Sequence, residues 1–257
     1  MQIALKDWKC EVRSAKDEPT AGLNPNSHVP LPASDFLLWQ LADSAFPTGG
    51  FAHSSGLEAA RQHGVVRNRA ELLAFLETSL RQLERASLPL VRAAHDDPQK
   101  LNELDRLSEA FLSNHVANRA SRAQGKALLL AVQRIFPEHP VEVSRTDAVP
   151  EPGASAPPFG HFAPAFGAVT RRLGLPLRSA TRLFCFNHLR GVLAAAVRLN
   201  IVGPLEAQSI QHRLAAQAEN VVQRSEQLTL RDLAQTAPLL DLWQGTHDRL
   251  YSRLFQS

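Results

Sequence analysis

Ten histidines and two cysteines are the side chains of this sequence that could bind a transition metal. A strong site needs them at ligand spacing, as in the HxH, HExxH or CxxC patterns, and the sequence contains none of these. Glu138-His139 lies in a proline-rich stretch, and His161 and His188 lie in stretches with helical periodicity. We therefore predict no metal ligand and interpret each histidine as a surface or hydrogen-bonded side chain.

Three other patterns could indicate catalysis, and each lacks a required part. Gly125-Lys126 has no upstream glycines, which a phosphate-binding loop needs. Asp96-Asp97 resembles a magnesium-binding pair, but Lys100 and Leu101 stand where a further carboxylate is needed. Residues 53–55 (His-Ser-Ser) are adjacent, whereas a nucleophile and its base normally come from separate parts of a chain. We predict no catalytic residue, no cofactor and no enzyme activity.

Composition narrows the class of protein further. The chain has 28 basic and 25 acidic residues, a formal charge of +3 that is too small to indicate a nucleic-acid partner. Cys10 and Cys185 are too few for a disulfide framework, which favours a reducing compartment. Lys6 and Asp7 interrupt any secretory signal, and the apolar run at 192–197 is too short to span a membrane. We predict a soluble cytoplasmic protein without a membrane partner.

The elements that position these residues are predicted to be helices. Residues 1–33 mix charges and prolines without periodicity, which predicts a flexible N-terminal arm. From Ser34 onward apolar residues recur at helical spacing, until Pro47 and Gly49-Gly50 break the helix. Alternating strand patterns and internal repeats are absent from the sequence.

Two helix starts have capping signals. Ser55 followed by Glu58 predicts a capping box that opens a helix over 56–63. Asn68 followed by Glu71 predicts the start of a longer helix.

The rest of the chain continues this helical pattern around one proline-rich stretch. Residues 137–158 carry six prolines and predict a long surface loop. Two helices are predicted from Pro98 to about Phe136, one near 161–173, and one over 179–200 that forms the central core helix. A further helix is predicted from Pro204 to about 227. The last helical region begins at Thr229 with Asp232 and breaks near Gly245. The predicted fold is all-α, a single-domain helical bundle of roughly eight to ten helices over 34–245, followed by a tail over 246–257.

The break between the first two helices has a distinctive sequence, LLWQLADSAFPTGGFAHSSGLE over residues 37–58. Pro47 favours an extended Phe46, and Gly49 and Gly50 permit positive φ, so the chain can reverse sharply there. One interpretation is a tight corner between packed helices; the other is a corner that also lines a protein interface.

Two further segments are similarly distinctive. The helical stretch NHVANRASRAQGK (114–126) places Arg119 and Arg122 three apart, which predicts either a solvated polar face or a partner contact. The C-terminal stretch HDRLYSRLFQS (247–257), taken as a helix, places Tyr251 and Phe255 on one apolar face. That face needs cover, from the protein's own core or from a partner.

Together with GHFAPAFG (160–167), these segments resemble the urease accessory protein F (UreF) family. The resemblance covers about 34–257; the long arm and the 137–158 loop depart from many bacterial members, and residues 186–205 look closer to the plant branch. It implies an all-helical homodimer that binds the D-type accessory protein (UreD, called UreH in some species) and the GTPase UreG, which carries nickel. The complex would dock on apo-urease and couple the GTPase state to nickel delivery.

The resemblance also implies two partner-binding segments. The residues expected to contact partners are Phe46, Pro47, Gly49, Gly50, Phe51 and His53 in the corner, and Tyr251, Ser252, Arg253, Leu254 and Phe255 in the tail. Two alternatives stay open: a direct nickel-binding carrier that uses the dispersed histidines, and a helical enzyme such as a terpenoid synthase-like protein.

Overall fold

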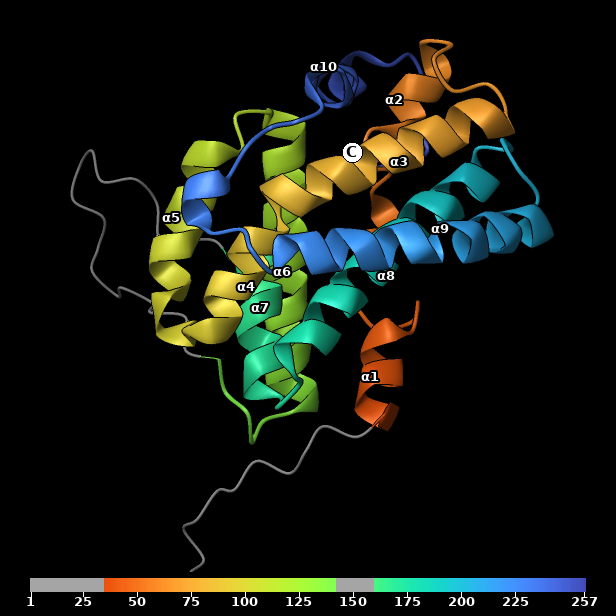
Figure 1. The fold of residues 1–257 in the computed structure, drawn as a ribbon. Coiled ribbons are helices and arrows are strands. Elements are labelled where there is room, and N and C mark those ends of the chain that lie inside the picture. The colour runs from red at the N-terminus through yellow and green to blue at the C-terminus, as the bar shows by residue number, and fades with distance from the viewer. Residues whose placement is uncertain (1–34, 142–159) are drawn as a thin grey trace, which may run out of the picture. The chain divides into compact units, whose positions relative to one another are not determined.

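The computed structural model describes residues 35–141 and 160–257. Over these ranges the chain forms helices and no strand, which confirms the all-α prediction (Figure 1). The α-helices are α1 (Asp35–Ala42), α2 (Leu57–Gln62), α3 (Arg69–Ala86), α4 (Leu88–Asp96), α5 (Leu101–Phe111), α6 (His115–Ile135), α7 (Phe162–Arg172), α8 (Leu177–Arg198), α9 (Pro204–Ser225) and α10 (Pro238–Gly245).

Single turns of 3-10 helix join several of these elements. They are η1 (Gly50–Ala52), η2 (Pro98–Lys100), η3 (Leu230–Asp232) and η4 (His247–Arg249). The predicted arm (1–33), Ser34 and residues 142–158 of the predicted proline-rich loop lie outside the described residues. None of the described helices combines the length and the apolar composition that crossing a membrane requires.

Side-chain caps are present at two of the helix starts that the sequence predicts. The Asn68 side chain accepts hydrogen bonds from the amides of Ala70 and Glu71 at 3.0 and 3.1 Å, so α3 begins as predicted. Thr229 and Asp232 form a capping box, although it opens only the single turn η3. Proline at the first position of α9 likewise agrees with the predicted start at Pro204.

The predicted capping box at Ser55 and Glu58 is wrong. Ser55 has a φ of 53°, and the residue that precedes α2 is Gly56, with a φ of 83° and no side-chain cap. Ser54 takes over part of the role, because its hydroxyl accepts a hydrogen bond from the Glu58 amide at 3.3 Å. The Glu58 side chain is turned into the protein and is only 2% exposed. A tertiary contact has therefore replaced the local cap.

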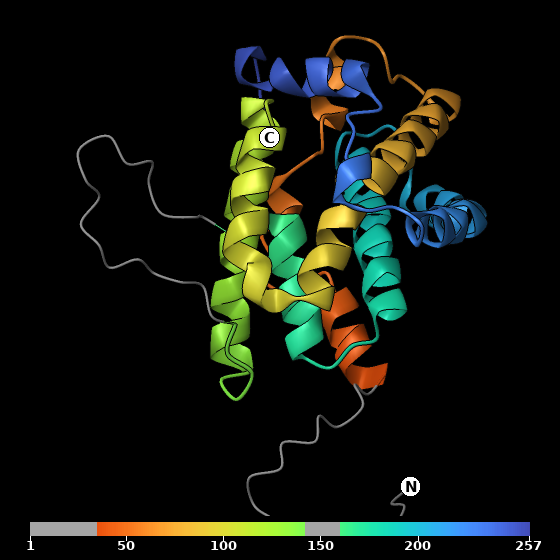
Figure 2. The same ribbon diagram turned by 60° about the vertical axis from the view of Figure 1, so that its left-hand side comes forward.

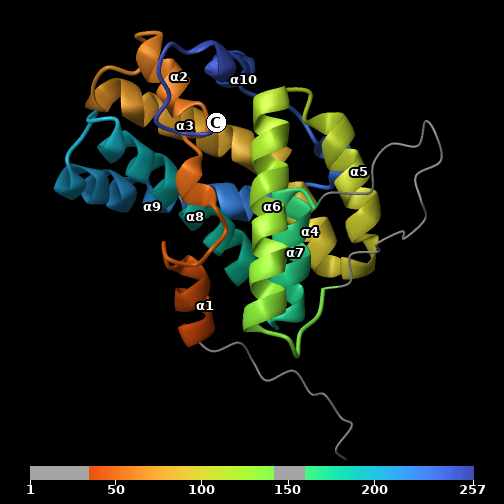
Figure 3. The ribbon, with the colours of Figure 1, turned by 180° about the vertical axis from the view of Figure 1, so that it is seen from behind.

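Helix α8 lies at the centre of the core, as predicted. It contacts α1, α2, α3, α4, α7 and α9, and its buried residues include Leu183, Leu189 and Leu193. Seen from behind in Figure 3, α6 runs beside α7, and α10 lies next to α6 and α2. The turned view in Figure 2 shows α4 and α7 side by side within the same group of helices.

Glycines set how closely α7 approaches its neighbours. A Cβ added to Gly167 would overlap the carbonyl oxygen of Val91 on α4, and one added to Gly125 on α6 would overlap the carbonyl oxygen of Gly160. Both glycines belong to the segments that stood out in the sequence. Their role is to let backbones touch, which a helix pattern alone does not explain.

Replacing Gly167 by alanine should therefore destabilise the fold. The added methyl group has to push α7 away from α4, and overpacking of this kind costs about 1–3 kcal/mol. Urea unfolding followed by circular dichroism would measure the loss. Gly191 is the matched control, since it also lies inside a long helix but has no atom within 4 Å of an added Cβ. Gly191→Ala should keep or raise stability, by up to about 1 kcal/mol; equal losses in both variants would contradict this account.

Candidate functional site

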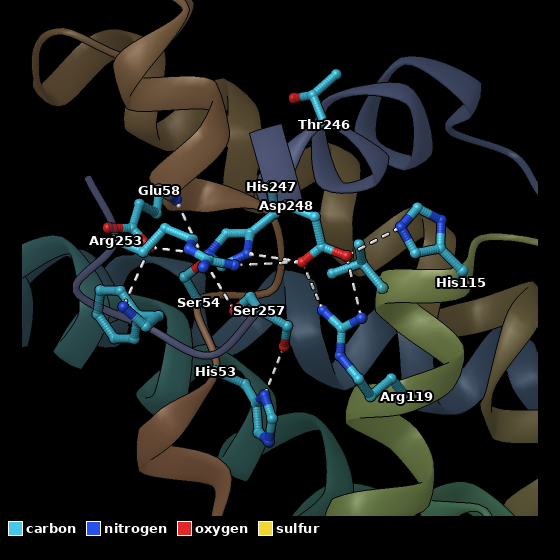
Figure 4. A network of polar contacts seen from close by, with 12 residues as sticks. His53, Ser54, Glu58, His115, Arg119, Thr246, His247, Asp248, Arg253 and Ser257 are labelled. Carbon is cyan, nitrogen blue, oxygen red and sulfur yellow. Dashed lines mark hydrogen bonds and ion pairs between the residues drawn. The ribbon is translucent and has the colours of Figure 1, made fainter. Parts of the chain in front are cut away.

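The structure brings the two predicted partner-binding segments together, although about 200 residues separate them in the sequence. We call residues 46–53 the corner and residues 246–257 the tail. The Gln256 amide donates to the carbonyl oxygen of Ala52 at 2.8 Å, and the Ser54 amide donates to that of Ser257 at 2.6 Å. Figure 4 shows the side chains around this junction. The corner and the end of the tail therefore form one continuous surface.

The corner makes a series of tight turns, and its two glycines have different roles. Gly49 has a φ of 70°, a conformation that favours glycine, whereas Gly50 begins the turn η1. Phe46 is buried in the core, while Phe51 is 70% exposed. His53 is buried at the end of the corner, and its Nδ1 lies 2.5 Å from the hydroxyl of Ser257. Pro47 and Gly49 lie exposed at the surface.

The helical prediction for the tail is wrong beyond a single turn. Only His247–Arg249 is helical, and the following residues run as an irregular segment back to the corner. Tyr251 is fully exposed, and Ser252, Arg253 and Leu254 are also exposed. Phe255 is 5% exposed and belongs to the hydrophobic core. The protein's own core thus covers Phe255, whereas the other four predicted tail residues remain accessible.

Arg198, the last residue of α8, joins the corner to the tail. Its guanidinium lies between two aromatic rings, 3.9 Å from the ring centre of Phe51 and 4.1 Å from that of Phe255. Its Nη1 also donates to the carbonyl oxygen of Phe51 at 2.6 Å. A guanidinium between two ring faces is held by cation–π attraction on both sides. No local pattern in the sequence distinguishes this arginine from other helix-terminal ones.

The start of the tail is tied to α6 through Asp248. Arg119 donates to both carboxylate oxygens of Asp248, at 2.7 and 3.0 Å, and His115 contacts it at 3.1 Å. Arg253 lies 3.6 Å away in the same tail. Hydrogen bonds from Arg119 are the main reason that the pKa of Asp248 falls to about 2. Arg119, predicted to lie on a solvated or partner-facing helix surface, contacts the protein's own tail.

A cavity of about 490 Å³ lies beneath the corner. Its lining includes His53, Ser79, Asn187 and His188. Burial is the main cause that lowers the pKa of His53 to about 4, and burial lowers that of His188 to about 4. Both imidazoles are therefore neutral near pH 7. His188 hydrogen-bonds Ser79.

His53, His161 and His188 line the same cavity, but each of the three has different hydrogen-bond partners. Ser54 and Ser55 are not the partners of His53, whose ring contacts Ser257. His161 is held by Glu109 at 2.8 Å and Ser121 at 3.1 Å, which fixes the start of α7 against α5 and α6. Within the described parts of the chain, no three His, Cys, Asp or Glu side chains are grouped so that they could hold a metal ion. The hydrogen bonds of His53 and His161 connect different elements of the fold.

Comparisons with known proteins all identify the same family. The family model UreF matches residues 66–215. The protein named urease accessory protein F from rice (Oryza sativa subsp. japonica) is 39% identical over 249 residues, covering 96% of this chain and 91% of the relative. The protein of the same name from Arabidopsis thaliana is 41% identical over 221 residues, covering 85% and 91%. Urease accessory protein UreF from Trichodesmium erythraeum is 32% identical over 227 residues, covering 85% and 94%.

Two aromatic residues of the tail should contribute very differently to the stability of the fold. Phe255→Ala should lower the free energy of unfolding by about 3 kcal/mol or more, because it empties a well-packed core position. Tyr251→Ala should change it by less than about 0.5 kcal/mol, because that side chain is exposed. Urea unfolding of both variants measures the difference, and a large loss in Tyr251→Ala would show that the tail is packed differently.

Acid should weaken the fold through His53 and His188. Both titrate near 6.5 in an unfolded chain but near 4 in the folded protein, so the unfolded state binds more protons between these values. Stability is therefore full above about pH 6.5 and falls as the pH drops toward 4, by up to about 1.4 kcal/mol per pH unit for each histidine. Urea titrations at pH 7, 6 and 5 measure this slope.

The variant His53→Gln should flatten that slope, since glutamine does not titrate. His212→Gln is the matched control, because His212 is exposed on α9. Working at pH 5 and above limits the contribution of Asp248 and Glu219, whose unfolded forms take up protons mainly below that range. An identical slope in the wild-type protein and in His53→Gln would exclude His53 as a source of the effect.

Proposed function

Because the chain belongs to the urease accessory protein F (UreF) family, we propose that it acts in urease maturation as a non-catalytic protein scaffold. In this role it binds the D-type accessory protein (UreD or UreH) and the GTPase UreG, and brings them to apo-urease for nickel insertion. The scaffold works as a homodimer in the cytoplasm. It couples the nucleotide state of the GTPase to nickel release, for which a coupling free energy of about 1–3 kcal/mol is sufficient.

The observation that carries this proposal is the joint surface of the corner and the tail. Four of the five predicted tail residues are exposed, and they lie in a segment whose two ends are fixed to the protein body. Tyr251 and Arg253 are of the types that contribute most at protein interfaces. Tyr251 and Leu254 both expose apolar area in the same segment, and a partner that covers both would gain from burying it.

The protonation states of two cavity histidines and of Cys185 support a role without catalysis. The two lowered-pKa histidines, His53 and His188, contact serine hydroxyls at Ser257 and Ser79. The Cys185 thiol is buried, and burial is the main reason that its pKa rises to about 12, which keeps it in the unreactive thiol form. A general acid–base or nucleophilic mechanism needs a group poised for proton transfer near neutral pH.

We assign the tail to the D-type partner and the corner to the rim of the same interface. Exposed Phe51 is held beside the tail by Arg198, so a partner that covers Tyr251 can reach it. Phe46 and Phe255 support this surface from within, because both are buried. They shape the interface without being accessible to a partner.

Recruitment of the D-type accessory protein tests the proposal. Co-expression with a tagged D-type partner, followed by affinity capture, should recover the wild-type chain but at least about tenfold less of Tyr251→Ala or Arg253→Ala. Circular dichroism should show an unchanged helical fold, because both side chains are exposed.

Leu205→Ala is the matched control for this capture. Leu205 is an apolar side chain that is 89% exposed on α9, away from the tail in sequence, and its loss should leave recruitment unchanged. Full recruitment of Tyr251→Ala would contradict the assignment of the tail. Deleting the whole tail is a poorer test, since it would also remove the buried residues His247 and Phe255.

A further inference from the structure

Glu58 on α2 has a position that its local sequence does not explain. Its carboxylate is 2% exposed, and it receives three hydrogen bonds from the tail. The Oε2 atom lies 3.0 Å from Nε2 of His247 and accepts from the Phe255 amide at 3.2 Å, while Oε1 accepts from the Leu254 amide at 2.6 Å. One buried carboxylate therefore holds both ends of the segment between His247 and Phe255.

The segment closed in this way forms an exposed loop, residues 248–254. Tyr251 lies in its middle and is fully exposed. On one side Asp248 is bound to Arg119 of α6, and on the other Gln62 of α2 donates to the carbonyl oxygen of Ser252 at 2.7 Å. The loop is thus attached at its base and along its length, while its apex presents an aromatic ring to solvent.

We propose that Glu58 is a positioning residue that closes this loop and pre-organises Tyr251 for capture by a partner protein. The inference rests on the proposed scaffold function and adds how its binding surface is prepared. The fitting partner surface is an apolar pocket with an acidic rim. Tyr251 and Leu254 supply exposed apolar area, and Arg249 and Arg253 flank them with positive charge.

Pre-organisation has a direct physical benefit. A free tail would lose backbone and side-chain freedom when it binds, and a loop that is already closed avoids most of that loss. The buried carboxylate suits this purpose because the three donors of the tail replace the water that it has lost. If the partner instead required the tail to leave the protein body, the contacts of Glu58 would oppose binding. The two cases predict opposite effects of weakening Glu58.

The single tyrosine of the chain gives a direct readout of loop order. Protein labelled with 3-fluorotyrosine should show one fluorine resonance, broadened by slow tumbling with the body. In Glu58→Gln the amide group cannot accept all three hydrogen bonds, so the loop should become mobile and the line at least about twofold narrower. Recruitment of the co-expressed D-type accessory protein should fall roughly tenfold, although Tyr251 is intact.

Two further variants make the test specific. Glu71→Gln removes a carboxylate of α3 that pairs with Arg67 far from the tail in sequence, and it should change neither line width nor recruitment. Gln62→Ala loosens the same loop from an exposed position and should act in the same direction as Glu58→Gln, so the test remains decisive even if Glu58→Gln does not fold.

The outcomes separate this inference from the proposed function. Normal recruitment by Tyr251→Ala overturns the proposed role of the tail itself. Loss of recruitment in Tyr251→Ala combined with normal recruitment by Glu58→Gln and Gln62→Ala overturns only the positioning role. Stronger recruitment by the loosened variants overturns it as well, because it would mean that the partner binds a released tail. An unchanged fluorine line in both would show that Glu58 does not order the loop.

Discussion

Burying a carboxylate in a protein is costly unless hydrogen-bond donors replace its water, and this constraint organises the part of the molecule that we propose binds partners. Glu58 lies on the short helix α2, which the corner leads into, and its donors come from the far end of the chain. The buried acid thus joins the beginning of the described fold to its end. The corner, the end of α8 and the tail become one surface because this group is satisfied there.

Neighbouring residues of that surface have different roles. Phe255 and His247 are buried and hold the tail in place, while Tyr251 between them is exposed. Arg198 also holds the tail to the corner, since its guanidinium lies over the rings of both Phe51 and Phe255. A segment that is rigid at its base and apolar at its apex is suited to binding another protein at a small cost in conformational entropy.

The cavity beneath this surface has polar side chains among apolar ones. The imidazoles of His53 and His188 line the cavity in their neutral form and contact serine hydroxyls. Charged groups are mostly paired at the surface, as Asp248 is with Arg119, so they position elements of the fold. The proposed scaffold role needs this kind of order, in which the contact residues keep fixed relative positions.

The sequence by itself determined the helical class, most helix starts and the two segments of interest, because periodicity, caps such as Asn68 and breakers such as Pro47 act over a few residues. It could not show that the corner and the tail meet, that the tail leaves the helical path after η4, or that Glu58 is turned inward. Those outcomes depend on contacts between residues far apart in the chain. Only the tertiary structure decided them, because burying Phe255 and satisfying the Glu58 carboxylate outweigh the local preferences for a helical tail and for a cap at Ser55.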